Sequence, residues 1–305
     1  MALEIDTQPE TWREAARLAT EPSCPLPAVG QRVAVVGCGT SWFMAQAYAA
    51  LRESLGHGVT DAFAASEARL LDRAYDSVVV ISRSGTTTEV LQVLDEARGR
   101  IHSVAVVGDP DSPMTSAADA VVRLPFADER SVVQTRFATT ALTLLRAHLG
   151  RDVTESVTDA EEALRRPIDD AWITAEQFSF LGLGWTVGLA NEAALKLRES
   201  SQSWTEAYPA MEYRHGPIAI AAPGRITWMF GAAPDGLADE VNRTGALFVQ
   251  HDADPLAELV LVQRVALERA RARGLDADAP RNLSRSVILE DPTTPRTATS
   301  GREGR

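Results

Sequence analysis

Short runs rich in Val and Ile alternate with longer stretches rich in Ala, Leu and Arg along the first half of the chain. The short β-branched runs are typical of buried strands, and the longer stretches have the apolar spacing of amphipathic helices. Strands that alternate with helices predict a parallel sheet, because parallel neighbours need a long crossover connection. The expected strands are Arg32 to Val36, Val59 to Phe63, Ser77 to Ile81, Ser103 to Val107 and Ala120 to Leu124, with helices such as Ser41 to Ser54 and Thr87 to Arg98 between them.

A second, shorter series of such runs follows in the other half of the chain. After an expected helix over Val132 to Leu149 and a charged stretch over Arg151 to Asp170, the expected strands are Phe178 to Leu183, Ile226 to Phe230 and Ala246 to Gln250. The segment "AVVGCGTSWFMAQAYAALRES" at 34–54 is similar to "FLGLGWTVGLANEAALKLRES" at 180–200. This similarity predicts a duplicated unit, although Ala-rich helices can also look alike by chance. We therefore expect two α/β domains, at 12–150 and 165–290, and a disordered tail at 291–305, which is rich in Pro, Thr and charge.

Composition narrows the class of protein. The 305 residues are 45% hydrophobic, which is sufficient for packed cores, and the formal charge of −12 argues against a nucleic-acid surface. No apolar run approaches the ~20 residues of a membrane span, and residues 1–10 do not resemble a secretory signal, so we expect a cytoplasmic protein without membrane contact. The two cysteines, Cys24 and Cys38, form no metal-binding pattern, so no metal site is expected.

A loop rich in hydroxyl groups, "SRSGTTTEV" at 82–90, follows the third expected strand. In a parallel sheet this loop lies at the carboxyl end of the strands, where ligands bind. Ser82, Ser84 and Thr87 would sit beside N–H groups at a helix start, which together suit a phosphate group. The alternative is ordinary helix capping, since Ser, Thr and Gly are preferred in such loops.

The first loop, Gly37-Cys38-Gly39, invites a dinucleotide-binding interpretation, and Asp61 has the spacing of a ribose-binding carboxylate. However, the third glycine of that motif would fall at residue 42, which is Trp42. We therefore expect no nicotinamide and no other cofactor. A nicotinamide-dependent thermal shift would contradict this expectation.

Four collinear motifs carry a resemblance to a known family. They are "GCGTSW" at 37–42, "SRSGTTTEVL" at 82–91, "EAALKLRESSQSWTEAYPAMEYRHGPIAI" at 192–220 and "PRNLSRSV" at 280–287. Together they resemble the sugar isomerase (SIS) family, in particular its double-SIS members: the isomerase half of glucosamine-6-phosphate synthase, amino-sugar phosphate deaminases and fructosamine phosphate deglycases. The resemblance implies two flavodoxin-like, doubly wound SIS subdomains, the first of which holds a sugar phosphate.

The resemblance also implies roles for individual residues. The phosphate-binding set would be Thr40, Ser41, Ser82, Arg83, Ser84 and Thr87, with Val132 and Arg285 as further substrate-binding residues. Glu199 would move the proton between C1 and C2, Lys196 would support it, and His215 would open the sugar ring. Because the family's loop histidine serves the neighbouring subunit's site, a homodimer is implied. Without the other motifs, Lys196 and Glu199 would read as a surface ion pair and His215 as a structural or surface residue.

Two departures limit what the resemblance implies. Arg285 stands where the synthase has a lysine that forms a Schiff base, and a guanidinium that stays protonated is a poor amine nucleophile. Ala2 follows Met1, so no N-terminal cysteine is present and we expect no glutaminase within this chain.

The expected function is a phosphosugar isomerase-type enzyme that interconverts an aldose and a ketose, or removes nitrogen from a sugar phosphate by deamination or deglycation. The alternative is a phosphosugar-binding sensor without catalysis.

Overall fold

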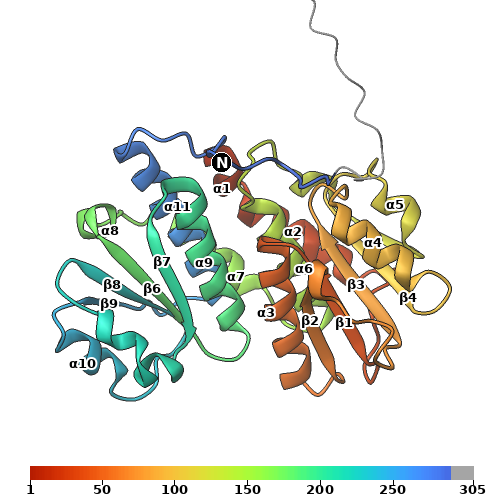
Figure 1. The fold of residues 1–305 in the computed structure, drawn as a ribbon, viewed down its shortest axis with the longest axis horizontal. Coiled ribbons are helices and arrows are strands. Elements are labelled where there is room, and N and C mark those ends of the chain that lie inside the picture. The colour runs from red at the N-terminus through yellow and green to blue at the C-terminus, as the bar shows by residue number, and fades with distance from the viewer. Residues whose placement is uncertain (290–305) are drawn as a thin grey trace, which may run out of the picture.

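Residues 1–289 are described by a computed structural model of the chain, and they contain two parallel sheets flanked by helices (Figure 1). The first sheet has the strand order β2-β1-β3-β4-β5. Its strands are β1 Val33–Gly37, β2 Thr60–Ala64, β3 Ser77–Ser82, β4 His102–Val107 and β5 Ala120–Arg123. All of their pairings are parallel, and each expected strand is confirmed to within one residue at each end.

The second sheet has the order β7-β6-β8-β9, again with parallel pairings. Its strands are β6 Gln177–Gly182, β7 Trp204–Pro209, β8 Arg225–Phe230 and β9 Leu247–Val249. Strand β7 was not among the expected strands. It is an edge strand of sequence "WTEAYP", partly exposed and without an apolar β-branched residue, so it lacks the pattern of a buried strand.

The helices correct two of the expected helix bounds and add one helix that was not predicted. They are α1 Ala2–Asp6, α2 Gln8–Ala19, α3 Thr40–Ser54, α4 Thr88–Ala97, α5 Met114–Ala117, α6 Arg136–His148, α7 Thr154–Arg165, α8 Asp170–Thr174, α9 Thr186–Ser201, α10 Leu237–Asn242 and α11 Pro255–Ala272. Helix α6 begins four residues after the expected start at Val132, because residues 129–135 form a loop. The charged stretch after it contains helix α7. The sequence alone suggested a helix over Ala190 to Arg198 that ends at Glu199, but helix α9 continues to Ser201 and Glu199 lies inside it.

Helices α3 and α9 join the two halves of the molecule by packing against each other (Figure 1). The contact is close at Gly188, where an added Cβ would lie 2.5 Å from the Phe43 carbonyl oxygen and 2.8 Å from the Ala47 backbone nitrogen. Only a residue without a side chain permits this approach.

The two halves share one local geometry that supports the predicted duplication. An added Cβ at Gly37, the last residue of β1, would lie 2.6 Å from the Ser41 backbone, and one at Gly182, the last residue of β6, would lie 2.4 Å from the Thr186 backbone. In both halves the chain turns tightly from the strand into the following helix, and glycine is required where it turns. The domain bounds 12–150 and 165–290 stay predictions.

The segment after α11 returns to the first half of the molecule. Figure 1 shows it running along one side of the molecule from the second half to the region of α4. We call residues 279–289 the strap. Its far end is fixed to α4, since the Thr88 backbone N–H donates to the Val287 carbonyl at 3.2 Å. The tail predicted to be disordered lies outside the described residues. None of the helices within residues 1–289 has the length and apolar character needed to cross a bilayer.

Candidate functional site

The hydroxyl-rich loop lies between β3 and α4 and is braced by its own side chains. The Ser82 hydroxyl accepts a hydrogen bond from the Gly85 N–H at 3.1 Å, and the Ser84 hydroxyl accepts one from the Thr86 N–H at 3.3 Å. Gly85 has φ +60°, and an added Cβ would lie 2.1 Å from the Ser112 Oγ. These contacts fix the loop's shape at the carboxyl end of the sheet.

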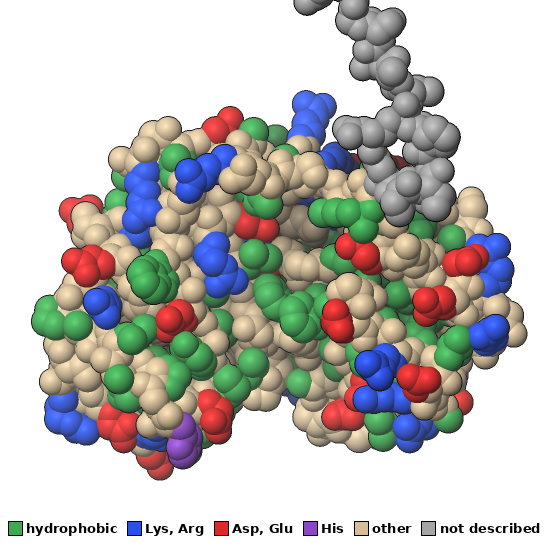
Figure 2. Space-filling view, viewed as in Figure 1, with side chains coloured by type: hydrophobic (Ala, Val, Ile, Leu, Met, Phe, Trp, Pro, Cys, Tyr) green, Lys and Arg blue, Asp and Glu red, His purple; other side chains and the backbone are tan. Residues whose placement is uncertain are grey.

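A pocket of about 170 Å³ opens beside this loop. It is lined by Cys38, Gly39, Thr40, Arg83, Thr87, Val132, Gln134, Glu199, Leu283, Ser284, Arg285, Ser286 and Val287. Residues from both sheets' helices and from the strap therefore meet in one place, although they are far apart in the sequence. Figure 2 shows the surface hollowed along the boundary between the two halves of the molecule.

Six of the predicted site residues line this pocket: Thr40, Arg83, Thr87, Val132, Glu199 and Arg285. Three predicted phosphate ligands, Ser41, Ser82 and Ser84, are buried and do not line it. Lys196 lies fully buried beneath the pocket, in contact with Thr40 and Glu199.

Helix α9 carries two carboxyl groups around one buried lysine. Lys196 Nζ lies 2.5 Å from Glu199 Oε2 and 3.4 Å from Glu192 Oε1, and it donates to the Thr40 hydroxyl at 3.0 Å. The Glu199 side chain is 20% exposed and reaches the pocket, whereas that of Glu192 is fully buried. Residues 192, 196 and 199 are spaced four and three apart, so the sequence places them on one face of a helix. Glu192 was nevertheless not among the predicted site residues.

Burial decides the protonation of the inner carboxyl group. It raises the pKa of Glu192 to about 8, and the nearby Lys196 only partly offsets this. Burial alone would lower the pKa of Lys196, but the two carboxylates outweigh it and the pKa is raised. At neutral pH the cluster therefore contains the Lys196 ammonium and a largely protonated Glu192.

Arg83 braces the pocket walls from inside. Its buried guanidinium donates to the carbonyl oxygens of Ser131 at 2.7 Å, Val132 at 3.2 Å and Arg285 at 2.9 Å. One side chain of the hydroxyl-rich loop thus connects that loop to the loop 129–135 and to the strap. Because the guanidinium donates these hydrogen bonds to backbone carbonyl groups, it holds the walls of the pocket in place.

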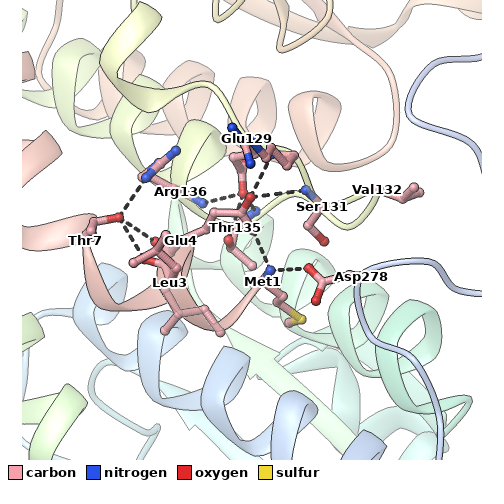
Figure 3. Close-up of polar contacts among 12 residues, drawn as sticks. Met1, Leu3, Glu4, Thr7, Glu129, Ser131, Val132, Thr135, Arg136 and Asp278 are labelled. Carbon is pink, nitrogen blue, oxygen red and sulfur yellow. Dashed lines mark hydrogen bonds and ion pairs between the residues drawn. The ribbon is translucent and has the colours of Figure 1, made fainter.

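The loop 129–135 is held by two acidic side chains (Figure 3). Buried Glu129 accepts hydrogen bonds from the backbone N–H groups of Thr135, Arg136 and Phe137 at the start of α6. Glu4 accepts from the N–H groups of residues 130 and 131 at 2.8 and 3.1 Å. Both were missed in the sequence, because a carboxylate that binds backbone groups across a loop leaves no spacing pattern.

The strap forms hydrogen bonds with the hydroxyl-rich loop between β3 and α4. The Ser286 hydroxyl lies 2.9 Å from the Thr86 hydroxyl and 3.4 Å from the Thr87 hydroxyl, and the Val287 carbonyl accepts from the Thr88 N–H. Arg285 donates to Asp128 Oδ1 at 2.6 Å. Groups suited to an anion at the α4 N-terminus are therefore hydrogen-bonded to the strap.

His215 lies apart from this pocket within the chain. It is exposed at the end of the short 3₁₀-helix Glu212–His215 and is not among the pocket's lining residues. Its predicted role in a neighbouring subunit's site stays a prediction.

Comparison with known proteins agrees with the geometry. Residues 29–149 match the SIS domain family. This segment is therefore a SIS domain, and the two parallel sheets of the chain suggest a double-SIS arrangement. It is 30% identical to glutamine–fructose-6-phosphate aminotransferase [isomerizing] of Neisseria meningitidis, over 85% of this chain and 52% of that protein. The chain thus spans about half the length of the curated relatives it matches.

Solved structures give the same result for the fold. The glucosamine-6-phosphate deaminase of Thermotoga maritima superposes with a TM-score of 0.76 and 25% identity, covering 94% of this chain and 99% of that one. The tagatose-6-phosphate ketose/aldose isomerase of Escherichia coli superposes with a TM-score of 0.73 over 95% of this chain and 96% of that one, at 16% identity. The α/β fold with two parallel sheets is confirmed.

Proposed function

We propose that the protein is a phosphosugar isomerase-type enzyme that acts on a ketose or amino-sugar 6-phosphate. It would move a proton between C1 and C2, or remove nitrogen from a sugar phosphate that carries it there. The observation that carries this proposal is the position of Glu199, whose carboxylate reaches the same pocket as Thr87 of the hydroxyl-rich loop. The names of the relatives, which include isomerases and a deaminase of phosphosugars, support it.

The geometry suits proton transfer between neighbouring carbons. A base for this step must take a proton from one carbon and return it to the next through an enediol, so it must be ionised and held in one orientation. Lys196, at 2.5 Å, fixes the orientation of the Glu199 carboxylate through a charge-assisted hydrogen bond. Burial of the lysine prevents water from replacing that contact.

The phosphate would bind at the other end of the pocket, at the start of α4. Thr87 and Arg83 line the pocket with Thr40, and the buried Ser41, Ser82 and Ser84 would support its wall. The amides at a helix start favour an anion, and Val132 and Arg285 close the pocket from the opposite side. For the phosphate to reach these groups, the strap's Ser286 and Val287 must release them.

Solvent-deuterium exchange into hexose 6-phosphates tests the proposal and separates an enzyme from a sensor. We expect exchange at C1 or C2 with the unaltered protein, and its loss in Glu199→Gln with phosphosugar binding retained. Glu96→Gln, an exposed carboxyl of α4, is the matched control and should exchange normally. Binding without exchange by the unaltered protein would favour the sensor, and undiminished exchange by Glu199→Gln would refute the role of that residue.

The proposal includes a cytoplasmic homodimer in which His215 opens the ring bound by the partner. A mixture of Glu199→Gln and His215→Asn subunits tests this arrangement, because a mixed dimer regains one site with both groups intact. We expect about a quarter of the normal activity from a statistical mixture of two inactive variants. No recovery in mixed dimers would place His215 outside the neighbouring site.

A further inference from the structure

Gln134 lines the pocket beside the hydroxyl-rich loop but has no part in the proposed function. It belongs to the loop 129–135 and was not among the predicted site residues. Its Oε1 is buried and has no hydrogen-bond partner within residues 1–289. A buried carbonyl oxygen without a partner loses the hydrogen bonds that water gives it in the unfolded chain, so native structures retain few of them. This oxygen therefore needs a donor that the described part of the chain does not supply.

The chemistry of the missing partner follows from the rest of the pocket lining. Most of its other polar side chains already have hydrogen-bond partners: Thr40, Thr87, Glu199, Ser284, Arg285 and Ser286. Arg83 also lines the pocket, and its buried Nε likewise has no partner within residues 1–289. Arg83 Nε is a donor, whereas Gln134 Oε1 is an acceptor. A hydroxyl group both donates and accepts, so it suits a pocket with a buried free acceptor and a buried free donor.

The loop holds Gln134 in position before any ligand binds. On one side of it, the Val132 carbonyl accepts a hydrogen bond from Arg83 at 3.2 Å. On the other side, the Thr135 N–H donates to Glu129 Oε2 at 2.7 Å. A side chain on a fixed backbone loses less entropy on binding than one on a mobile loop. Gln134 is therefore preorganised to contact a ligand in this pocket.

The part of the sugar that Gln134 contacts follows from the proposed function, on which this inference rests. With the 6-phosphate at the start of α4 and C1 and C2 beside Glu199, the middle carbons of the sugar lie between the two ends, where the loop 129–135 lines the pocket. C3 and C4 carry free hydroxyl groups there, because the C5 oxygen closes the ring in the common cyclic forms. We infer that Gln134 accepts a hydrogen bond from the hydroxyl group on C3 or C4. It then selects the sugar by its configuration at that carbon, which neither the phosphate site nor the proton transfer distinguishes.

Deoxy analogues test the inference by titration calorimetry. The parent ligand is whichever of fructose 6-phosphate and its C3 and C4 epimers binds most tightly, and two analogues of it lack the C3 or the C4 hydroxyl group. We expect one analogue to bind the unaltered protein about tenfold more weakly than the parent does. In Gln134→Met, which keeps the length of the side chain without its amide, this ratio should fall toward one. Gln250→Met, the same change at an exposed position after β9, should keep the ratio.

The stability of the ligand-free variant gives a second measurement. Loss of an unpaired buried oxygen removes no hydrogen bond, so we expect ligand-free Gln134→Met to unfold at the same temperature as the unaltered protein or at a higher one. A lower unfolding temperature would mean that ordered water already satisfies the oxygen, and it would overturn the inference.

The outcomes separate this inference from the proposed function. The inference is overturned if the unaltered protein binds the parent and both analogues equally, or if the weaker binding of an analogue persists in Gln134→Met. In either case, deuterium exchange into the parent sugar would still support the proposed function. If no phosphosugar binds at all, the proposed function fails and the inference fails with it.

Discussion

Glu192 lies on the buried face of α9, beside Lys196. Its carboxyl group is fully buried, and burial raises its pKa from 4.5 to about 8. A raised pKa means that the folded state binds this proton more tightly than the unfolded chain does. The resulting stabilisation is complete below about pH 4.5 and is lost as the pH rises through about 8.

The isosteric variant Glu192→Gln cannot lose this proton. Between pH 6 and 9 we therefore expect the unfolding free energy of the unaltered protein to fall relative to that of Glu192→Gln, as measured by urea denaturation at each pH. Parallel pH curves for the two proteins would show that Glu192 does not titrate in this range.

Replacement of Gly85, compared with that of Gly99, distinguishes the effect of a steric clash in the loop from the effect of backbone strain alone. Gly85→Ala places a methyl group 2.1 Å from the Ser112 Oγ at φ +60°, so we expect a loss of about 1–3 kcal/mol of stability and weaker phosphosugar binding. Gly99→Ala is the control, since Gly99 also has positive φ (+70°) but nothing lies within 4 Å of the added Cβ. It should lose less stability and keep its affinity, as thermal shift with and without phosphosugar would show.

At the scale of elements, the loop 129–135 depends on one buried carboxylate. Glu129→Ala removes the acceptor of three backbone N–H groups and the Thr135 hydroxyl, so we expect a loss of about 2–3 kcal/mol in denaturant unfolding and lower phosphosugar affinity. The control Asp152→Ala, at an exposed carboxylate that accepts only the Thr154 N–H, should cost about 1 kcal/mol or less. Equal losses would mean that burial of the Glu129 contacts adds nothing.

The strands could be predicted where burial on both faces selects continuous β-branched runs, as in β1 and β3. Strand β7 could not, because an edge strand that is partly exposed tolerates Glu206 and Pro209. The start of α6 was also missed, since Val132 and Val133 have helix-like apolar spacing but lie in a loop. Arg83 holds that loop through the carbonyl oxygens of residues 131 and 132, and Glu4 holds it through the N–H groups of residues 130 and 131. Such contacts come from other parts of the fold and leave no local signal.

The candidate site was predictable in its location more than in its detailed contacts. Hydroxyl groups after β3 pointed to one end of the pocket, whereas Glu199 at the other end came from the family resemblance, since the Lys/Glu spacing alone predicted a surface ion pair. The sequence could not show that Ser82 and Ser84 accept hydrogen bonds from their own loop, or that the Arg83 side chain binds backbone carbonyls. It also could not distinguish a solvated Lys/Glu pair from one in which the lysine is fully buried.

At the scale of the whole molecule, the site depends on the contact between α3 and α9. Thr40 on α3 accepts from Lys196 on α9 at 3.0 Å, so the supporting lysine is fixed across the boundary between the two halves. Any change that separates these helices should disturb the Glu199 carboxylate as well.

Gly188→Ala tests this dependence with an unusual sign. Within a helix this change normally stabilises a protein by about 0.5–1 kcal/mol, but here the methyl group would meet the Phe43 carbonyl at 2.5 Å. We expect instead a loss of about 1–3 kcal/mol on thermal unfolding, together with slower deuterium exchange into the sugar. Increased stability with full activity would show that the two helices can separate without consequence.

In the proposed binding mode, the strap described above competes with the phosphate for the groups at the start of α4. Ser286 and Val287 are hydrogen-bonded to the Thr86 and Thr87 hydroxyls and to the Thr88 amide. A phosphoryl group can therefore bind these groups only after the strap has released them. In stopped-flow mixing, the observed rate of association should level off at high sugar concentration, at the frequency with which the segment detaches by itself.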